Sequence, residues 1–298
     1  MQLQILMQLQ ILIVMQFSVG SFNVRGLTDD WKKKQLARDV INYKVDVCAL
    51  QETKVQTATE ACVDGCKLIT FESESKYYGN GFMVAPQFRD RIHKHWRISD
   101  RICVLQLSEA NYKCEAQGDL KVKIVNQGTD GKKLINIINA YAPTSDRGNK
   151  FPIELERFYK QLEKVSRDLG KLPSSMTIIA GDFNSKIGKR IGFETCIGNW
   201  SRGYRNKNGS SLVEFCEKND KIIANSCFQH SARHITTWSQ TRRDKSGKPF
   251  TIYNQIDYVI MDHKNKQILT DARSYSGTET FSDHRLVVAR MIRVSYKC

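Results

Sequence analysis

The segment Gly181-Asp182-Phe183-Asn184 places a carboxylate and a carboxamide two positions apart, directly after the apolar run MTIIA at 176–180. A short run of branched apolar residues predicts a buried strand. Residues two apart in an extended backbone point to the same side, so we expect Asp182 and Asn184 to converge at the end of a core strand. α/β proteins place their chemistry at such strand ends. A β-turn is the alternative, because Gly, Asp and Asn are common turn residues.

Polar side chains also stand at the ends of other predicted strands. Besides Asp182 and Asn184, they are Asn23, Glu52, Tyr141, Asp257, Ser282, Asp283 and His284. The set is rich in oxygen and lacks paired thiolates, and hard oxygen ligands suit Mg²⁺ or Mn²⁺ better than zinc. Because Mg²⁺ keeps several waters and uses only one or two protein carboxylates, Glu52 and one aspartate would be sufficient.

Each of these residues also has a structural interpretation. Asn23 could cap or turn the chain, and Glu52 could be an exposed loop acid. Tyr141 could be a half-buried core aromatic, and His284 alone would more often be structural than catalytic. Asp257 lies among Ile and Tyr side chains and is expected to be at least partly buried, which is costly for a carboxylate without a partner. A histidine partner would offset that cost, so the functional interpretation depends on the whole set.

The polar residues at the strand ends must be positioned by secondary structure, and the sequence contains more strand patterns than helix patterns. Strands are expected at 14–24, 45–50, 81–85, 98–107, 120–125, 134–141, 176–180, 221–224, 255–261 and 286–294. Helices are expected after a Thr28 cap through Tyr43, from Pro152 to Gly170, and after a Ser210 or Ser211 cap. A single parallel sheet would need a crossover between each strand pair. An α/β fold with two mixed sheets packed on each other and helices outside fits better.

The charge balance is the unusual feature of the composition. The 298 residues are 41% hydrophobic and 26% charged, which is ordinary for a globular protein, but 46 Lys and Arg face 31 Asp and Glu for a net charge of +15. Such a charge attracts nucleic acid, anionic membrane or acidic protein, although it could also serve solubility. Nine scattered cysteines show no zinc-ligand spacing, which favours free thiols in a reducing compartment.

The amino terminus repeats MQLQIL twice before the first predicted strand. We expect residues 1–13 to be an appendage, or an extension of the first strand, and residues 14–298 to form the domain. The apolar stretch 11–15 is too short to span a bilayer, and no positive charge precedes it as in a signal peptide. A nuclear or cytoplasmic location without membrane contact is therefore expected.

Seven motifs, taken in order, resemble the endonuclease/exonuclease/phosphatase superfamily over residues 15–293. They are NVRGL at 23–27, QET at 51–53, NAYAP at 139–143, GDFN at 181–184, TW at 237–238, IDY at 256–258 and SDH at 282–284. Within the superfamily, NVRGL, NAYAPT, NKNGSSLVEF and NQIDYVI look most like the apurinic-type endonuclease of non-LTR retrotransposons. The RTE-type elements and the related craniofacial-development-protein-2-like sequences are the most similar.

The resemblance implies a four-layer α/β sandwich and metal-dependent hydrolysis of phosphodiesters. Carried over motif by motif, Glu52 is the main Mg²⁺ ligand, with Asn23 beside it and Asp283 close to the metal. Mn²⁺ is a possible substitute. Asp182 then orients or deprotonates the attacking water, with help from Asn184.

The remaining motif residues are expected to act on the phosphate. By resemblance, Tyr141 and His284 contact the scissile phosphate and stabilise its developing negative charge. Asp257 pairs with His284 and keeps it oriented and protonated, since a carboxylate partner raises the pKa of an imidazole. Ser282 and Thr237 support phosphate or backbone contacts, whereas neighbouring Trp238 is expected to be a packing residue.

The expected partner is DNA, and the chain is expected to be a monomer. In this fold the substrate is selected by surface loops, here 196–208, 239–251 and 271–281. Their candidate phosphate contacts are Arg202, Arg205, Arg242 and Arg243, each of which could instead be a solvated charge. Retrotransposon elements of this type continue into a reverse transcriptase, so a longer parent polyprotein is possible.

Three other functions stay open. A phosphatase of the same superfamily would act on phosphoinositides or small phosphoesters, and a host repair enzyme would cut at abasic sites. A domesticated nucleic-acid-binding protein would have no turnover, but a pure binder gains little from clustered carboxylates next to phosphate. The basic charge and the retrotransposon-like motifs favour a DNA endonuclease.

Overall fold

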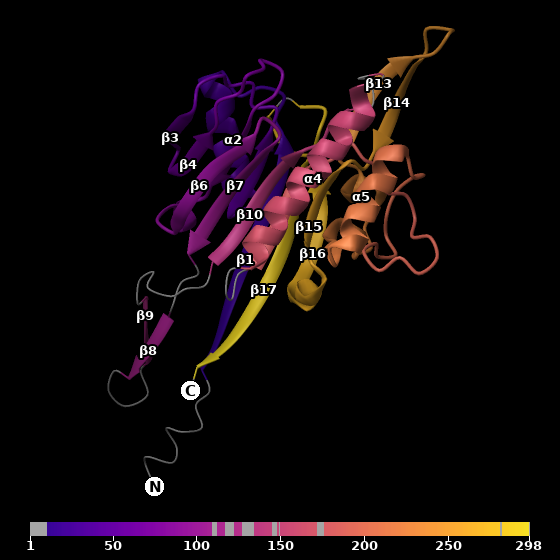
Figure 1. Ribbon diagram of the computed structural model, residues 1–298. Coiled ribbons are helices and arrows are strands. Elements are labelled where there is room, and N and C mark those ends of the chain that lie inside the picture. The colour runs from indigo at the N-terminus through magenta and orange to yellow at the C-terminus, as the bar shows by residue number, and fades with distance from the viewer. Residues whose placement is uncertain are drawn as a thin grey trace.

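Two mixed β-sheets form the centre of the fold in a computed structural model, which describes residues 11–108, 112–116, 122–126, 134–144, 148, 150–171, 176–280 and 282–297 (Figure 1). The seven-stranded sheet has the order β16 (Leu269–Tyr275), β17 (Leu286–Lys297), β1 (Ile11–Asn23), β2 (Val47–Gln51), β5 (Asn80–Val84), β4 (Cys66–Thr70) and β3 (Thr59–Val63). The six-stranded sheet has the order β12 (Lys221–Ile223), β15 (Asp257–Asp262), β11 (Met176–Asp182), β10 (Leu134–Tyr141), β7 (Ile102–Ser108) and β6 (Ile92–Ser99).

The two sheets pack face to face because their strands are apolar on both sides. Phe17 and Val19 of β1 belong to the cluster between the sheets, together with Ile178 and Ala180 of β11. The residues between them point the other way, as Ile179 does into the cluster on the outer face of the six-stranded sheet. Strands buried on both faces read as continuous apolar runs, and this explains the run at 176–180.

Helices cover both outer faces and complete the predicted four layers. The helix α2 (Asp30–Asn42) packs through Leu36 and Val40 on the seven-stranded sheet. The helices α4 (Phe151–Gly170) and α5 (Lys207–Lys218) pack through Leu162 and Phe215 on the six-stranded sheet. The predicted fold class, an α/β sandwich of two mixed sheets with helices outside, is therefore confirmed.

The shorter elements lie around this sandwich. They are α3 (Pro86–Arg89), α6 (Ala232–Ile235), η2 (Ala224–Ser226), η3 (His263–Ile268), and the two hairpins β8 (Tyr112–Ala116) with β9 (Val122–Asn126) and β13 (Trp238–Arg243) with β14 (Pro249–Asn254). The β13–β14 hairpin projects away from the sandwich at the upper right of Figure 1. Part of the predicted surface loop 239–251 is thus regular antiparallel ribbon.

Parallel neighbours bring the chemical strand ends to one edge. The pair β1 and β2 is parallel, with Asn23 opposite Gln51, and the pair β10 and β11 is parallel, with Tyr141 opposite Asp182. β15 runs antiparallel to β11, so its first residue, Asp257, lies opposite Asp182. The close approach of β10 and β11 requires glycine at Gly181, because a Cβ there would lie 1.9 Å from the Ala140 carbonyl oxygen.

Several predicted boundaries were wrong. The single strand expected at 98–107 is two strands, β6 and β7, joined by a turn at Asp100 and Arg101. The helix expected after Ser210 or Ser211 begins at Lys207, because Asn206 is the cap and its side chain accepts a hydrogen bond from the Gly209 N–H. The first helix is preceded by Asp29 rather than Thr28. The strands β3, β4, β8, β13, β14 and β16 were not predicted.

Most of the predicted appendage at 1–13 lies outside the described residues, because the structure describes the chain only from residue 11. Its last three residues belong to β1, where Ile11 pairs with Lys297. The seven cysteines whose state the structure gives are free thiols, as expected: Cys48, Cys62, Cys66, Cys103, Cys196, Cys216 and Cys227. Within the described part of the chain, no helix has the length and apolar character needed to cross a membrane.

Candidate active site

Asn23 joins the two sheets at the edge where the strands end. Its Nδ2 donates to Glu52 Oε1 at 3.0 Å and to Asp182 Oδ2 at 3.0 Å. Asn23 is fully buried, and its own Oδ1 accepts a hydrogen bond from the Arg25 N–H at 3.2 Å. One amide therefore connects a carboxylate following β2 of one sheet with a carboxylate ending β11 of the other.

Glu52 is placed by a left-handed backbone. Its φ is 50° and that of Lys54 is 55°, and the Glu52 carbonyl accepts a hydrogen bond from the Gly26 N–H at 2.7 Å. Tyr141 donates its hydroxyl to Glu52 Oε1 at 2.9 Å. Burial, and then the charges of Glu52 and Asp182, raise the Tyr141 pKa far above its usual range, so Tyr141 remains a phenol donor. The other oxygen, Oε2, lies 3.6 Å from the Lys54 ammonium.

Asp182 is buried and hydrogen-bonded through both oxygens. Besides the Asn23 amide on Oδ2, the Asn184 backbone N–H donates to Oδ1 at 2.9 Å. Burial and the nearby charge of Asp257 raise the Asp182 pKa to about 7. A carboxyl with this pKa can gain and lose a proton near neutral pH, which is the property of a general base.

Asn184 was predicted to lie in an extended backbone with Asp182, but it does not continue the strand. β11 ends at Asp182, and Asn184 has a φ of 49°, so the extended backbone assumed from the sequence was wrong. Its Nδ2 donates to the Ala142 carbonyl at 3.0 Å. Asn184 thus holds Asp182 through its backbone, and its side chain ties this turn to the residue that follows β10.

His284 and Asp257 form a buried pair. Nδ1 of His284 lies 3.1 Å from both carboxylate oxygens of Asp257, and Nε2 lies 3.8 Å from Asp182 Oδ2. Burial lowers the His284 pKa, but the charges of Asp257 and Asp182 outweigh it and raise this pKa to about 9. Thr237 holds Asp257 from behind, since its Oγ1 accepts hydrogen bonds from the Ile256 and Asp257 N–H groups at 2.9 and 3.1 Å.

Ser282 and Asp283 complete the edge. Ser282 donates its hydroxyl to the Asn23 carbonyl at 2.7 Å and accepts a hydrogen bond from the His284 N–H at 3.1 Å. Asp283 Oδ2 receives Arg25 at 2.6 Å and the Trp238 indole N–H at 3.0 Å. Trp238, expected only to pack, thus has a polar contact. The motif NVRGL contains Arg25, but nothing local in the sequence indicates a partner 258 positions away.

One cluster of ligand atoms, and two further carboxylate oxygens, are candidates for holding a cation. Ligand atoms of Asp182, Asp257 and His284 lie within 4.8 Å of one another. A histidine ligand must be neutral, and the raised pKa of His284 favours the cation, so a hydrogen-bonded network describes these three residues better. Hard oxygens are available at Glu52 Oε2 and at Asp283 Oδ1, a buried atom with no hydrogen-bond partner among the described residues. A buried carboxylate oxygen without a donor fits a metal such as Mg²⁺.

The four candidate arginines have different surroundings. Arg205 binds Glu194 and donates from Nε to the Ile187 carbonyl at 2.7 Å, so its guanidinium braces the loop before α5. Arg202 lies 5.9 Å above the Tyr253 ring of the β13–β14 hairpin. Arg242 and Arg243 are exposed on that hairpin.

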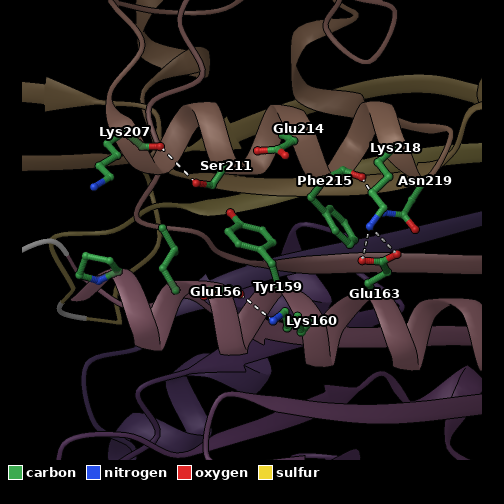
Figure 2. A pocket seen from close by; sticks show the side chains of 12 residues that line it. Glu156, Tyr159, Lys160, Glu163, Lys207, Ser211, Glu214, Phe215, Lys218 and Asn219 are labelled. Atoms are coloured by element: carbon green, nitrogen blue, oxygen red, sulfur yellow. Dashed lines mark hydrogen bonds and ion pairs between the residues drawn. The ribbon is translucent and has the colours of Figure 1, made fainter. Parts of the chain in front are cut away.

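A separate groove of about 340 Å³ lies between α4 and α5 (Figure 2). Its lining includes Leu155, Tyr159 and Phe215, and the rim carries ion pairs such as Lys218 with Glu163 at 3.1 Å. None of the site residues described above lines this groove. The polar strand-end site and the apolar groove between α4 and α5 are therefore different places on the molecule.

Known proteins match both the sequence and the fold. The sequence profile of the endonuclease-reverse transcriptase family matches residues 135–288. Craniofacial development protein 2 of Bos taurus is 24% identical over 278 residues, and that of Tragulus javanicus is 28% identical over 277 residues, each match covering 92% of this chain. The chain spans only 41% and 42% of the length of these two relatives.

Two solved structures show the same fold at low identity. The AP endonuclease LMAP from Leishmania major has a TM-score of 0.65 at 16% identity, covering 93% of this chain and 88% of that one. The endonuclease domain of TRAS1, a telomere-specific non-LTR retrotransposon, has a TM-score of 0.58 at 14% identity, covering 93% and 98%. With a family match over more than half its length and the predicted superfamily fold around it, this chain belongs to the endonuclease-reverse transcriptase family within the endonuclease/exonuclease/phosphatase superfamily.

Proposed function

We propose that this protein is a Mg²⁺-dependent endonuclease that nicks DNA by hydrolysing a phosphodiester bond. The observation that carries the proposal is the buried network in which Asn23 joins Glu52 to Asp182 while Asp257 holds His284 close to Asp182. It brings a candidate base, a candidate cationic donor and a candidate metal-binding carboxylate to one edge of the sandwich. Hydrolysis of a phosphodiester needs these three functions together.

Asp182 is the proposed base. With a pKa of about 7 it is ionised above neutral pH, and it then accepts a proton from a water held at its free lone pairs. The two N–H donors, from the Asn23 amide and the Asn184 backbone, fix the orientation of the carboxylate. The water oxygen bonds to phosphorus as the P–O bond to the leaving strand end breaks. The water proton passes to Asp182, and the leaving oxygen takes a proton from solvent.

His284 and Tyr141 are the proposed donors to the phosphate. The imidazolium of His284, with a pKa of about 9, presents Nε2 to the site while Nδ1 is bound to Asp257. The Tyr141 hydroxyl donates its one proton to Glu52 here, and it would turn that proton to the bound phosphate as a second, neutral donor. Donors that are fixed before the reaction stabilise the charge that develops on the phosphate oxygens.

Glu52 and Asp283 are the proposed metal ligands, through Glu52 Oε2 and Asp283 Oδ1, with Asn23 beside them. A bound Mg²⁺ supplies Lewis-acid polarisation of the phosphate. Mn²⁺ has similar oxygen preferences and is the expected substitute.

DNA is the proposed substrate because of the net charge of +15 and the exposed basic hairpin. Arg242 and Arg243, with Arg202 beside Tyr253, give this face contacts suited to a phosphate backbone. We also propose that the chain acts as a monomer and that a longer parent protein adds a reverse transcriptase domain.

Relaxation of supercoiled plasmid tests the proposal. The parent is incubated with Mg²⁺, with Mn²⁺ and with EDTA beside Asp182→Asn, His284→Gln and the control Asp168→Asn, which changes an exposed carboxylate on α4. We expect nicking by the parent and the control with either metal, and none with EDTA or the two site variants. Equal nicking by all variants would disprove the site. A parent that leaves plasmid intact but releases phosphate from phosphoinositides would disprove the substrate class, and cleavage confined to abasic duplex would indicate a repair enzyme.

A further inference from the structure

The short segment 276–280 leads from β16 into Ser282, Asp283 and His284. Of its residues, Ser276, Gly277 and Glu279 are exposed, whereas Thr280 is only 1% exposed. Thr280 is the buried residue at the end of this loop, so its contacts are the main ones that hold the loop in place.

Thr280 contacts a carboxylate that the proposed chemistry does not use. Its Oγ1 donates to Asp39 Oδ2 at 2.8 Å, and Asp39, on α2, is 3% exposed. The other groups that bind this carboxylate are Gln35, whose Nε2 lies 3.4 Å from Oδ1, and the Glu279 backbone N–H. A buried carboxylate without a cation among these partners is costly to keep. Its hydrogen bonds are stronger than those between neutral groups.

A second residue of α2's carboxyl end touches the same loop. The Tyr43 hydroxyl lies so close to Gly277 that a Cβ there would be 2.6 Å from it, so a larger residue would displace the tyrosine. The Tyr43 ring also packs on Tyr275, at the end of β16, with centroids 4.7 Å apart. α2 therefore fixes the loop at both ends, at Tyr275 through Tyr43 and at Thr280 through Asp39.

The segment after Thr280 is fixed to the other side of the site. Ser282 is bound to the Asn23 carbonyl and to the His284 N–H. Only one residue separates Thr280 from Ser282, so a shift of Thr280 along α2 would be transmitted to Asp283 and His284. The Asp39–Thr280 bond is thus a contact with α2 that lies two residues before Ser282.

We propose that Asp39 is a positioning residue, which through Thr280 sets the place of Asp283 and His284 opposite Asp182. This inference rests on the nuclease function proposed above. A displacement of a reacting group by about 1 Å can cost about a hundredfold in rate, whereas one hydroxyl bond contributes little to the stability of a domain of this size. The effect should therefore be on turnover.

Variants of Thr280 test the bond with minimal change of shape. We expect Thr280→Val to lower kcat for plasmid nicking about tenfold with KM within about twofold, because no substrate contact is removed. Thr280→Ser, which keeps the hydroxyl, should restore most of the rate. Asp39→Asn keeps an acceptor oxygen and should lose less activity than Asp39→Ala. The control is Thr270→Val on β16, which removes a hydroxyl bond to the Arg290 carbonyl on β17 and should leave kcat unchanged.

A double variant tests whether Asp39 and Thr280 affect the nicking rate through the same hydrogen bond. If both residues act through one bond, the double variant Asp39→Ala/Thr280→Val should be no slower than the slower single variant. Multiplied effects would overturn the inference, as would a full rate in Thr280→Val or a failure of Thr280→Ser to restore the rate.

Hydrogen–deuterium exchange gives a readout that does not require nicking. Peptides spanning 276–284 should exchange faster in Thr280→Val than in the parent and the Thr270→Val control, while peptides of β11 should not change. If the parent proves inactive, the proposed function fails and this exchange measurement alone decides the positioning role. Unchanged exchange at 276–284 would overturn it. If Asp39→Ala does not fold, the Thr280 pair still decides the outcome.

Discussion

The strand-end site and the β13–β14 hairpin carry opposite kinds of polarity. At the strand ends, Asp182, Asp257 and His284 are buried, and each is held by several hydrogen bonds. On the hairpin, Arg242 and Arg243 are exposed, and their side-chain hydrogen bonds to described residues go to Gln240 and to the Gly247 carbonyl. Asp182 and His284 have shifted pKa values, and all three buried side chains have fixed directions, as catalysis requires. The exposed arginines offer charge for contacts with a phosphate backbone.

The largest effects should follow from changes within the buried network. Asp182→Asn removes the base while keeping the volume, and His284→Gln removes the cationic donor. We expect each to reduce kcat about a thousandfold, with KM changed less than threefold, in a single-turnover nicking assay. If these variants lost activity mainly through a higher KM, the buried network would act on binding, and the proposed difference from the hairpin would be wrong.

The pH dependence of kcat should be set by the buried groups Asp182 and His284 and not by the hairpin arginines. Since Asp182 must be ionised and its pKa is about 7, kcat should fall tenfold per pH unit below that value. Since His284 must be protonated and its pKa is about 9, kcat should fall again above that value. The profile of an Arg242→Gln/Arg243→Gln variant should have the same shape. In His284→Gln the decline on the alkaline side should disappear from the residual activity.

Changes on the hairpin should act on binding with a smaller effect. Replacing Arg242 and Arg243 by Gln removes two candidate phosphate contacts, so KM should rise severalfold while kcat is kept. The slope of log affinity against log salt should become shallower by about two. Fluorescence anisotropy with a labelled duplex measures both. A matched Lys264→Gln variant in η3, outside both regions, provides the control, and an equal change in its salt slope would contradict a specific role for the hairpin.

The smallest expected effect is on stability. The folded pKa of His284 is raised from 6.5 to about 9, so the stability that its charge contributes is fully present below pH 6.5 and is lost as the pH rises through 9. The Tm of the parent should therefore fall by a few degrees between pH 7 and 9.5, and less in His284→Gln. Differential scanning calorimetry at both pH values provides the measurement, and an equal fall in the two proteins would show that the imidazolium is not stabilised by its aspartates.

Sequence reasoning predicted the sandwich because strands buried on both faces appear as apolar runs, as in 134–141 and 176–180. It grouped Asn23, Glu52, Tyr141, Asp182, Asp257 and His284, and the structure brings these residues together at one edge. What it missed depends on contacts that are distant in sequence or on local polar geometry. β3, with the sequence TEACV, is largely exposed and has no apolar run. The Asn206 cap and the left-handed turn at Asn184 depend on a few local polar contacts. The Arg25–Asp283 and Asp39–Thr280 bonds join residues more than 240 positions apart.

Four of the seven described non-glycine residues with positive φ lie at the site: Arg25, Glu52, Lys54 and Asn184. A left-handed backbone costs on the order of 1 kcal/mol for a residue with a Cβ and nothing for glycine. Selection for thermal tolerance alone would therefore enrich glycine at Arg25 and Lys54 in a random library, whereas selection for cleavage would keep the cations. The ratio of the two outcomes at each position would measure how much fold stability this protein has given up for its active site.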